Sequence, residues 1–192
     1  ITNKKGGYNM LKIIQSLTER RTYYDINKEL PVGLGEVVEL IKQATELVPD
    51  AFNMKSSRVV VVTGDKQNQL WDNIYTVFEG KIKHEKIDTF KNGFGTILYF
   101  YDHEVVENMQ NQFPAYASNF PIWASQSAGM LQISIWSGLK ELGIGASLQH
   151  YNPVIDEMVK KIFDLPDSYR LNAQMPFGGI VSSPDDKPKE DI

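Results

Sequence analysis

Two small groups of cations stand near opposite ends of an otherwise acidic chain. Arg20, Arg21 and Thr22 come at the end of the first expected helix, and Lys187 and Lys189 lie close to the C-terminus of a chain whose net charge is −4. Guanidinium and ammonium groups bind a phosphate dianion well, so these cations predict a phosphate site. The alternative is that they are solvated surface charges, as most Lys and Arg side chains are.

Residue sets that carry catalysis by themselves are missing from the sequence. There is no cysteine, and the three histidines, His84, His103 and His150, lack the spacing of a metal site. Three Gly-x-Gly pairs lack the third glycine of the dinucleotide fingerprint, and neither a Gly-x-x-x-x-Gly-Lys-Ser/Thr loop nor a Gly-x-Ser-x-Gly elbow occurs. We therefore expect no metal, and an enzyme of this sequence would take its reactivity from a bound, phosphorylated cofactor.

Length and composition indicate one globular domain. The chain has 192 residues, of which 42% are apolar and 23% charged, enough to bury a full core. Helical periodicity begins at Met10, so we expect residues 10–192 to form the domain and residues 1–9 to be a tag remnant or an upstream extension. The pI near 5.4 and the lack of a long apolar run argue against nucleic-acid and membrane partners, so a cytoplasmic protein is expected.

Hydrophobic periodicity predicts an α+β fold in which strands are interspersed among helices. The expected helices cover 10–21, 34–48, a segment that Asp65 caps and that reaches Phe78, 104–110, 122–142 and 153–163. The expected strands cover 59–62, 96–101, 146–151 and 171–181. The unbroken run of valines at 59–62 is typical of a strand buried on both faces.

The segment 122–142 differs from the other helices because its apolar residues point in all directions. Small residues such as Ala124, Ala128 and Gly129 are interleaved with Ile122, Met130 and similar side chains. A helix that is apolar all round is expected to be buried on every side, either in a domain core or between two subunits.

Four motifs, in this order and spacing, resemble the FMN-dependent nitroreductase family. They are Arg20-Arg21-Thr22, then Pro-Asp-Ala-Phe-Asn-Met-Lys-Ser-Ser-Arg at 49–58 before a valine-rich strand, then Gly-Ile-Gly-Ala-Ser-Leu-Gln-His-Tyr-Asn-Pro at 143–153, and finally Lys187-Pro188-Lys189. The sequence is similar in particular to the short branch related to the fatty-acid-repression-mutant proteins. The resemblance extends over nearly the whole chain from Met10.

The resemblance implies a three-layer fold in which helices flank a mostly antiparallel sheet, and an intertwined homodimer with two FMN molecules at its interface. It also implies a ping-pong reaction in which NADH or NADPH reduces FMN and a small-molecule acceptor, such as a nitroaromatic or a quinone, reoxidises it. No catalytic side chain is needed, because the cofactor carries the chemistry.

The family motifs assign cofactor contacts to individual residues. The arginine motif would contact the phosphate, ribityl chain and ring edge, and the terminal basic pair would help to bind the phosphate. The 49–55 loop would reach the flavin of the partner subunit. The backbone at 149–150 would run beside the flavin ring. The cofactor-binding residues expected on this basis are Arg20, Arg21, Thr22, Tyr24, Asn53, Lys55, Gln149, His150, Lys187 and Lys189.

Three residues depart from the family pattern. Asp50 and Ala51 stand where two serines are frequent, and Lys55 stands where glutamine is usual. Asp50 adds a negative charge near the cofactor, which Lys55 could offset by charge pairing. Purely structural alternatives stay open for two of the expected cofactor contacts. Asn53 could cap a turn, and His150 could be a packed strand residue.

Aromatic residues before the long helix are candidates for the acceptor pocket. We expect Phe113, Tyr116 and Phe120 near the acceptor, with a core or dimer-interface role as the alternative. The function expected from the whole sequence is an FMN-dependent NAD(P)H oxidoreductase. Two alternatives remain, a non-catalytic or regulatory flavin-binding protein and a flavin-modifying enzyme of the same fold.

Overall fold

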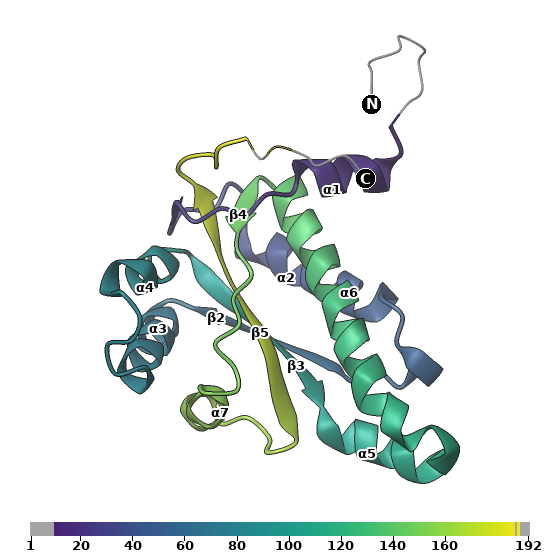
Figure 1. Ribbon diagram of the computed structural model, residues 1–192. Coiled ribbons are helices and arrows are strands. Elements are labelled where there is room, and N and C mark those ends of the chain that lie inside the picture. The colour runs from purple at the N-terminus through teal and green to yellow at the C-terminus, as the bar shows by residue number, and fades with distance from the viewer. Residues whose placement is uncertain (1–9, 187, 189–192) are drawn as a thin grey trace.

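The structure is a computed structural model that describes residues 10–186 and 188 (Figure 1). Its helices are α1 (Lys12–Glu19), α2 (Leu34–Leu47), α3 (Asp65–Val77), α4 (His84–Lys91), α5 (His103–Gln112), α6 (Phe120–Glu141) and α7 (Asp156–Phe163), with short 3-10 helices η1 (Ala51–Asn53) and η2 (Pro114–Asn119). Its strands are β1 (Ile26–Asn27), β2 (Ser57–Thr63), β3 (Gly95–Asp102), β4 (Ile144–Ala146) and β5 (Tyr169–Ile180).

The strands form one antiparallel sheet in the order β1-β5-β3-β2, and β4 also pairs with β5. Strand β3 lies between β2 and β5, and its pairing with β5 shifts register between Tyr99 and Phe100. The shift changes which face of the sheet the following side chains occupy. The extra residue lies on β5 between Leu171 and Ala173, so these two side chains pack on opposite faces, Ala173 with Tyr99 and Leu171 with Phe100.

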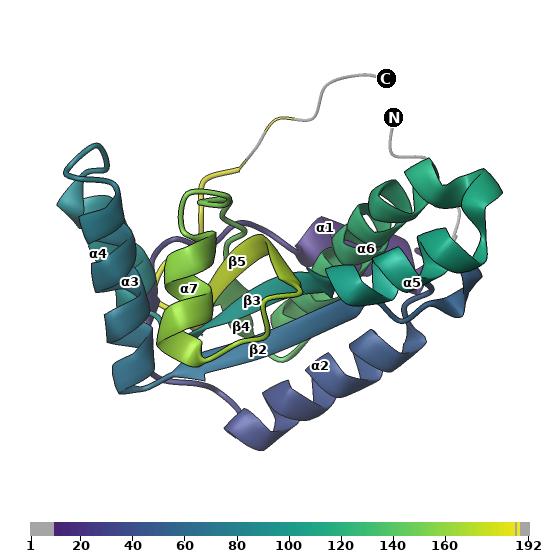
Figure 2. The same cartoon turned by 90° about the horizontal axis from the view of Figure 1, so that it is seen from below.

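Helices cover both faces of the sheet and make three layers (Figure 2). On one face, α2 and α6 pack Val37, Ile41 and Leu131 against β3 and β5. On the other face, α3, α4 and α7 supply Trp71, Phe90 and their neighbours. The three-layer α+β architecture expected from the sequence is therefore present.

Several sequence predictions of element boundaries are wrong in detail. Strand β2 is an edge strand; Val62 is buried, but the other valines are only partly covered, so the expected burial on both faces is found only in part. Gly64, with φ 60°, precedes α3, and Asp65 is the first helical residue rather than the cap. In place of the strand expected at 146–151, β4 covers 144–146, and beyond it only Gln149 pairs with β5, in a single bridge to Gln174. Helix α7 begins at Asp156, after a turn, and α4 and β1 were not anticipated.

Helix α6 departs from the prediction that it is buried on every side. Leu131 and Ile135 face the sheet, but Ile122 and Met130 are 56% and 42% exposed. Helix α1 lies across the C-terminal half of α6 (Figure 1) and buries none of its own residues. Helices α1 and α6 therefore make an apolar surface that no other described residue covers. In the described part of the chain, no helix is both long and apolar enough to span a bilayer.

Candidate functional site

Arg20 and Arg21 directly follow α1, where the backbone leaves the helix in extended conformation. The Arg20 guanidinium carbon lies 4.2 Å from the ring centroid of Trp136, on α6. Arg21 donates a hydrogen bond through Nη2 to the carbonyl oxygen of Asp185. The two arginines, the end of α1, Asp186 and Pro188 line an open hollow of about 530 Å³.

The environment of Arg20 suits an anion. Partial burial, and then the neighbouring charge of Arg21, lower the pKa of Arg20 from its ordinary value. Its Nε is buried and has no hydrogen-bond partner among the described residues. A partly desolvated cation with a free donor gains more from an anionic acceptor than a solvated one does.

One carbonyl fixes both the arginine segment and the ring beneath Arg20. The Ala146 carbonyl oxygen accepts from Tyr23 N at 3.0 Å and from Trp136 Nε1 at 3.2 Å. Next to it, Gly145 allows this close approach, since a Cβ there would lie 3.0 Å from the Tyr23 Cβ. Strand β4 therefore positions Arg20, and half-buried Thr22 lies within the same segment.

The remaining residues expected near the arginines have different surroundings. Tyr24 is exposed and packs against Phe90 of α4, at 6.3 Å between ring centroids, where it lines a separate hollow. Gln149 is buried and exchanges backbone hydrogen bonds with Gln174. His150 is exposed and lies outside β4, so the alternative of a packed strand residue is wrong. Lys187 and Lys189 lie outside the described residues.

The loop between α2 and β2 is held by Asp50. Its Oδ2 accepts from Ser56 N at 2.8 Å and from Ser56 Oγ at 2.7 Å. Lys55 Nζ donates to the carbonyl oxygen of Glu46 at 2.9 Å. The predicted charge pairing between Asp50 and Lys55 is therefore wrong, because each group is used in fixing the loop.

Three non-glycine residues of this loop adopt left-handed backbone. The φ angles of Phe52, Asn53 and Lys55 are 53°, 51° and 55°. Such conformations cost on the order of 1 kcal/mol or more each and persist where the surroundings fix them. The Asn53 side chain is exposed and makes no hydrogen bond within the described residues, so the turn is formed by its backbone N–H, which donates to the Asp50 carbonyl.

Phe52 is the centre of an aromatic cluster. Its ring centroid lies 4.9 Å from Phe113, 5.3 Å from Phe120, 5.9 Å from Tyr116 and 5.8 Å from Trp123. Phe120 is fully buried, whereas Phe52 and Tyr116 are about half exposed. The three residues expected near the acceptor thus lie together, and they lie against the 49–55 loop.

The arginine hollow and the aromatic cluster are at opposite ends of α6 (Figure 1). Trp136 marks one end and Trp123 the other, thirteen residues apart, which corresponds to roughly 20 Å along a helix. Within one chain, Arg20 and Asn53 therefore do not meet. In the described ranges, no three His, Asp or Glu side chains gather as metal ligands would.

The Nitroreductase family model matches residues 17–179, which include the arginine motif, the 49–58 loop and β4. The chain belongs to the nitroreductase family. Two proteins of Saccharomyces cerevisiae, HBN1 and the nitroreductase FRM2, are each 31% identical to this family member over 177 residues, 91% of each chain.

Solved structures agree with this assignment. Nitroreductase CinD from Lactococcus lactis, in complex with chloramphenicol, is 43% identical and has a TM-score of 0.88, covering 93% of this chain and 95% of that one. A nitroreductase family structure from Exiguobacterium sibiricum in complex with FMN, with 12% identity, 96% and 95% coverage and a TM-score of 0.72, shares the fold. The predicted fold class and family are confirmed, and this family member is a nitroreductase-type oxidoreductase.

The sequence did not predict that Phe52 lies at the centre of the aromatic cluster. Phe52 was one letter of a matched motif, and only the contact with Phe113 and Trp123 shows that it joins the loop to the aromatic cluster. Trp136 lies under Arg20, away from this cluster. The signal available in the sequence was limited to the position of Phe52 beside Asn53.

Proposed function

We propose that this nitroreductase-family protein is an FMN-dependent NAD(P)H oxidoreductase that reduces nitroaromatic or quinone-type acceptors in a ping-pong reaction. The observation that carries the proposal is Arg20, whose guanidinium lies over Trp136 with a buried, unpartnered Nε at the edge of an open hollow. Arg21 lines the same hollow, so two guanidinium groups are available to one phosphate.

The described residues fit the cofactor in a consistent way. Arg20 and Arg21 would hold the phosphate and the ring edge, and Thr22 and the backbone near Gln149 would lie beside the cofactor. Lys187 and Lys189 stay proposed as further phosphate ligands, and the described residues Asp186 and Pro188 line the hollow. Tyr24 and His150 remain predicted cofactor contacts.

The proposed assembly is a homodimer in which each site takes residues from both chains. Arg20 and Asn53 lie at opposite ends of α6, so a site that uses both needs a second copy of the chain. The apolar surface of α1 and α6 is available to that copy, since Ile13, Ile14 and Met130 are each more than 40% exposed. The loop residues Asn53 and Lys55 would then reach the partner's cofactor.

The proposed chemistry resides in the cofactor, and the chain binds and orients. Bound FMN would accept a hydride from NADH or NADPH and deliver it to the acceptor. Phe113, Tyr116 and Phe120, gathered around Phe52, would offer ring faces to an aromatic acceptor. This acceptor class is supported by CinD, which was solved with 4-nitrophenol and with chloramphenicol. Cytoplasmic location remains part of the proposal.

The proposal is tested by titrating the purified protein with FMN and following the quenching of flavin fluorescence. Replacing both arginines, Arg20→Ala and Arg21→Ala, is expected to raise the Kd by about a hundredfold, because two charge-assisted hydrogen bonds are lost. The double variant Lys86→Ala and Lys91→Ala, on α4, loses the same charge away from the hollow and should bind as wild type does. Equal binding by both double variants would place the phosphate site elsewhere.

A further inference from the structure

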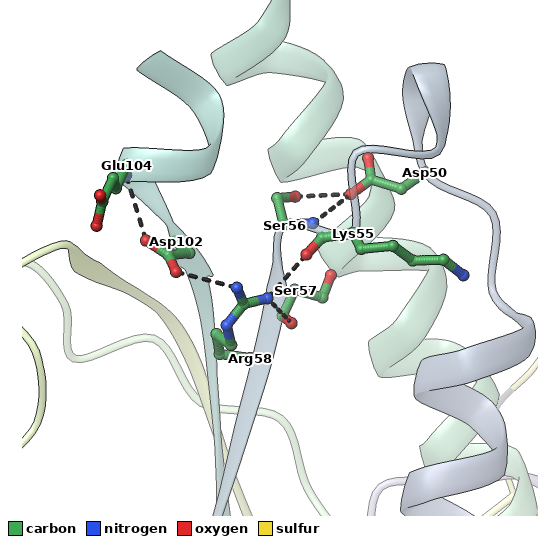
Figure 3. A network of polar contacts seen from close by, with 7 residues as sticks. All are labelled: Asp50, Lys55, Ser56, Ser57, Arg58, Asp102 and Glu104. Carbon is green, nitrogen blue, oxygen red and sulfur yellow. Dashed lines mark hydrogen bonds and ion pairs between the residues drawn. The ribbon is translucent and has the colours of Figure 1, made fainter. Parts of the chain in front are cut away.

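Arg58, at the start of β2, joins the 50–55 loop to the start of α5 (Figure 3). Its Nη1 donates to the carbonyl oxygens of Lys55, at 2.8 Å, and Ser57, at 3.0 Å. Its Nη2 donates to Asp102 Oδ2 at 3.0 Å. A guanidinium group is suited to this arrangement, because its donors are fixed in a planar fork.

Asp102 also binds the backbone of α5, so it links Arg58 to that helix. Its Oδ1 accepts from the backbone N–H of Glu104 at 3.2 Å and so caps the N-terminus of α5. The Asp102 side chain is only 13% exposed, and that of Arg58 is 33% exposed. The pair is thus more shielded from solvent than an ordinary surface ion pair, and a change in either partner affects both the loop and α5.

The loop needs such a connection. Phe52, Asn53 and Lys55 all have positive φ, and such backbone persists only where its surroundings fix it. Arg58 binds the carbonyl of the last of these three residues. At the other end of the connection, α5 leads into η2, and Phe113 and Tyr116 at that end contact Phe52. The ion pair is therefore linked to the aromatic cluster at both ends, directly to the loop that carries Phe52 and, through the length of α5, to Phe113.

We propose that Arg58 is a positioning residue that, through Asp102, holds the 50–55 loop and the aromatic cluster in the arrangement that binds cofactor and acceptor. This inference rests on the proposed function, because it assumes that Asn53 reaches the flavin and that Phe52 faces the acceptor. Arg58 itself would touch neither ligand. It acts through the Lys55 carbonyl and the cap of α5.

The test compares Arg58→Met, Arg58→Lys and Asp102→Asn with wild type. In Arg58→Met, the Kd for FMN and the KM for 4-nitrophenol are each expected to rise about tenfold, the effect of losing hydrogen bonds from a charged donor. Arg58→Lys should recover only part of this, since an ammonium group keeps the charge and loses the fork. Lys91→Met, which breaks the ion pair between Lys91 and Asp72 outside the site, is the matched control and should leave both constants unchanged.

Asp102→Asn separates positioning from long-range charge. Asparagine still caps α5, and the substitution makes the region more positive. A pure charge effect would tighten FMN binding in this variant, whereas loss of positioning should weaken it by a few fold. Tighter binding in Asp102→Asn would overturn the inference.

Amide hydrogen exchange of the cofactor-free protein gives a readout that does not depend on the proposed function. Exchange over residues 50–57 should quicken about tenfold in Arg58→Met and stay unchanged in Lys91→Met. Unchanged exchange in Arg58→Met would overturn the inference even if FMN binds as proposed. If wild type fails to bind FMN, the proposed function fails, and the exchange result alone decides whether Arg58 holds the loop.

Discussion

At the scale of single residues, the surroundings of a side chain decide its chemistry. The sequence indicates Arg20 and Arg21 equally, but only Arg20 lies over an indole ring with its Nε buried and unpartnered. Arg21 instead donates to the carbonyl of Asp185. The pair of arginines in the sequence was enough to predict a phosphate site. The sequence could not predict which of the two arginines is desolvated, because that depends on packing against Trp136, more than a hundred residues later.

Asp156, at the start of α7, makes the stability of the fold depend on pH. Desolvation is the main cause that raises the pKa of Asp156 to about 6 from 3.8, with Glu157 adding to it and Lys160 and Arg170 opposing it. Because the folded pKa is the higher one, the native state binds more protons, and stability falls as pH rises from about 4 to about 6.

The substitution Asp156→Asn removes this dependence. The free energy of unfolding of the variant minus that of wild type is therefore expected to grow between pH 4 and pH 7, by on the order of 1 kcal/mol after allowance for partial exposure. Urea unfolding at several pH values measures the difference. A difference that stays constant or shrinks over this range would show that the carboxyl titrates normally in the folded protein.

At the scale of elements, the short strand β4 carries more of the site than its length suggests. A Cβ at Gly145 would lie 2.9 Å from Ile180 Cγ1 and 3.0 Å from both Ile26 Cγ2 and Tyr23 Cβ. Gly145→Ala is therefore expected to displace the Tyr23 segment, lowering the free energy of unfolding by about 2 kcal/mol and weakening FMN binding as well.

Gly35→Ala is the matched control, because nothing lies within 4 Å of a Cβ at that helical position. The control is expected to be neutral or stabilising by up to about 1 kcal/mol, since alanine favours a helix. Chemical unfolding and FMN titration of both variants provide the measurement. If Gly145→Ala is as stable as wild type and binds FMN equally well, β4 does not position the arginine segment.

The elements that the sequence predicted well are those with a strong local pattern. Helices α2, α3 and α6 and strands β3 and β5 have long apolar runs or clear periodicity, and they lie close to their expected bounds. Strand β4 was misplaced because its bounds depend on pairing with β5, far along the chain. The left-handed backbone of Phe52 and Lys55 has no sequence signal, because such residues adopt it only when tertiary contacts fix it. Asn53 is the exception, since asparagine visits this conformation more readily.

At the scale of the whole molecule, the uncovered surface of α1 and α6 predicts a dimer. The double variant Ile13→Glu and Met130→Glu places charges on that surface, where the wild-type side chains are 62% and 42% exposed. Burying each such apolar side chain contributes on the order of 1.5 kcal/mol or more, so the variant is expected to be monomeric. Light scattering after gel filtration should give twice the 21.8 kDa chain mass for wild type and the mass of one chain for the variant.

Val154→Glu is the control for this experiment. Val154 is 56% exposed and directly precedes Ile155, the N-cap of α7. Helix α7 lies away from α1 and α6 (Figure 1), so the variant should remain dimeric. The monomeric variant should also bind FMN weakly, because Asn53 of one chain would no longer reach the cofactor of the other. A monomer with full FMN affinity would contradict the proposed two-chain site.

The most direct test of the central proposal is an anaerobic absorption experiment on the FMN-loaded protein. NADH and then NADPH are added, and the band of oxidised flavin is followed; an excess of 4-nitrophenol is added afterwards. An NAD(P)H oxidoreductase is expected to lose the band with at least one nicotinamide and to recover it with the acceptor. Flavin that stays oxidised with both nicotinamides would contradict the proposal and favour a flavin-binding or flavin-modifying role.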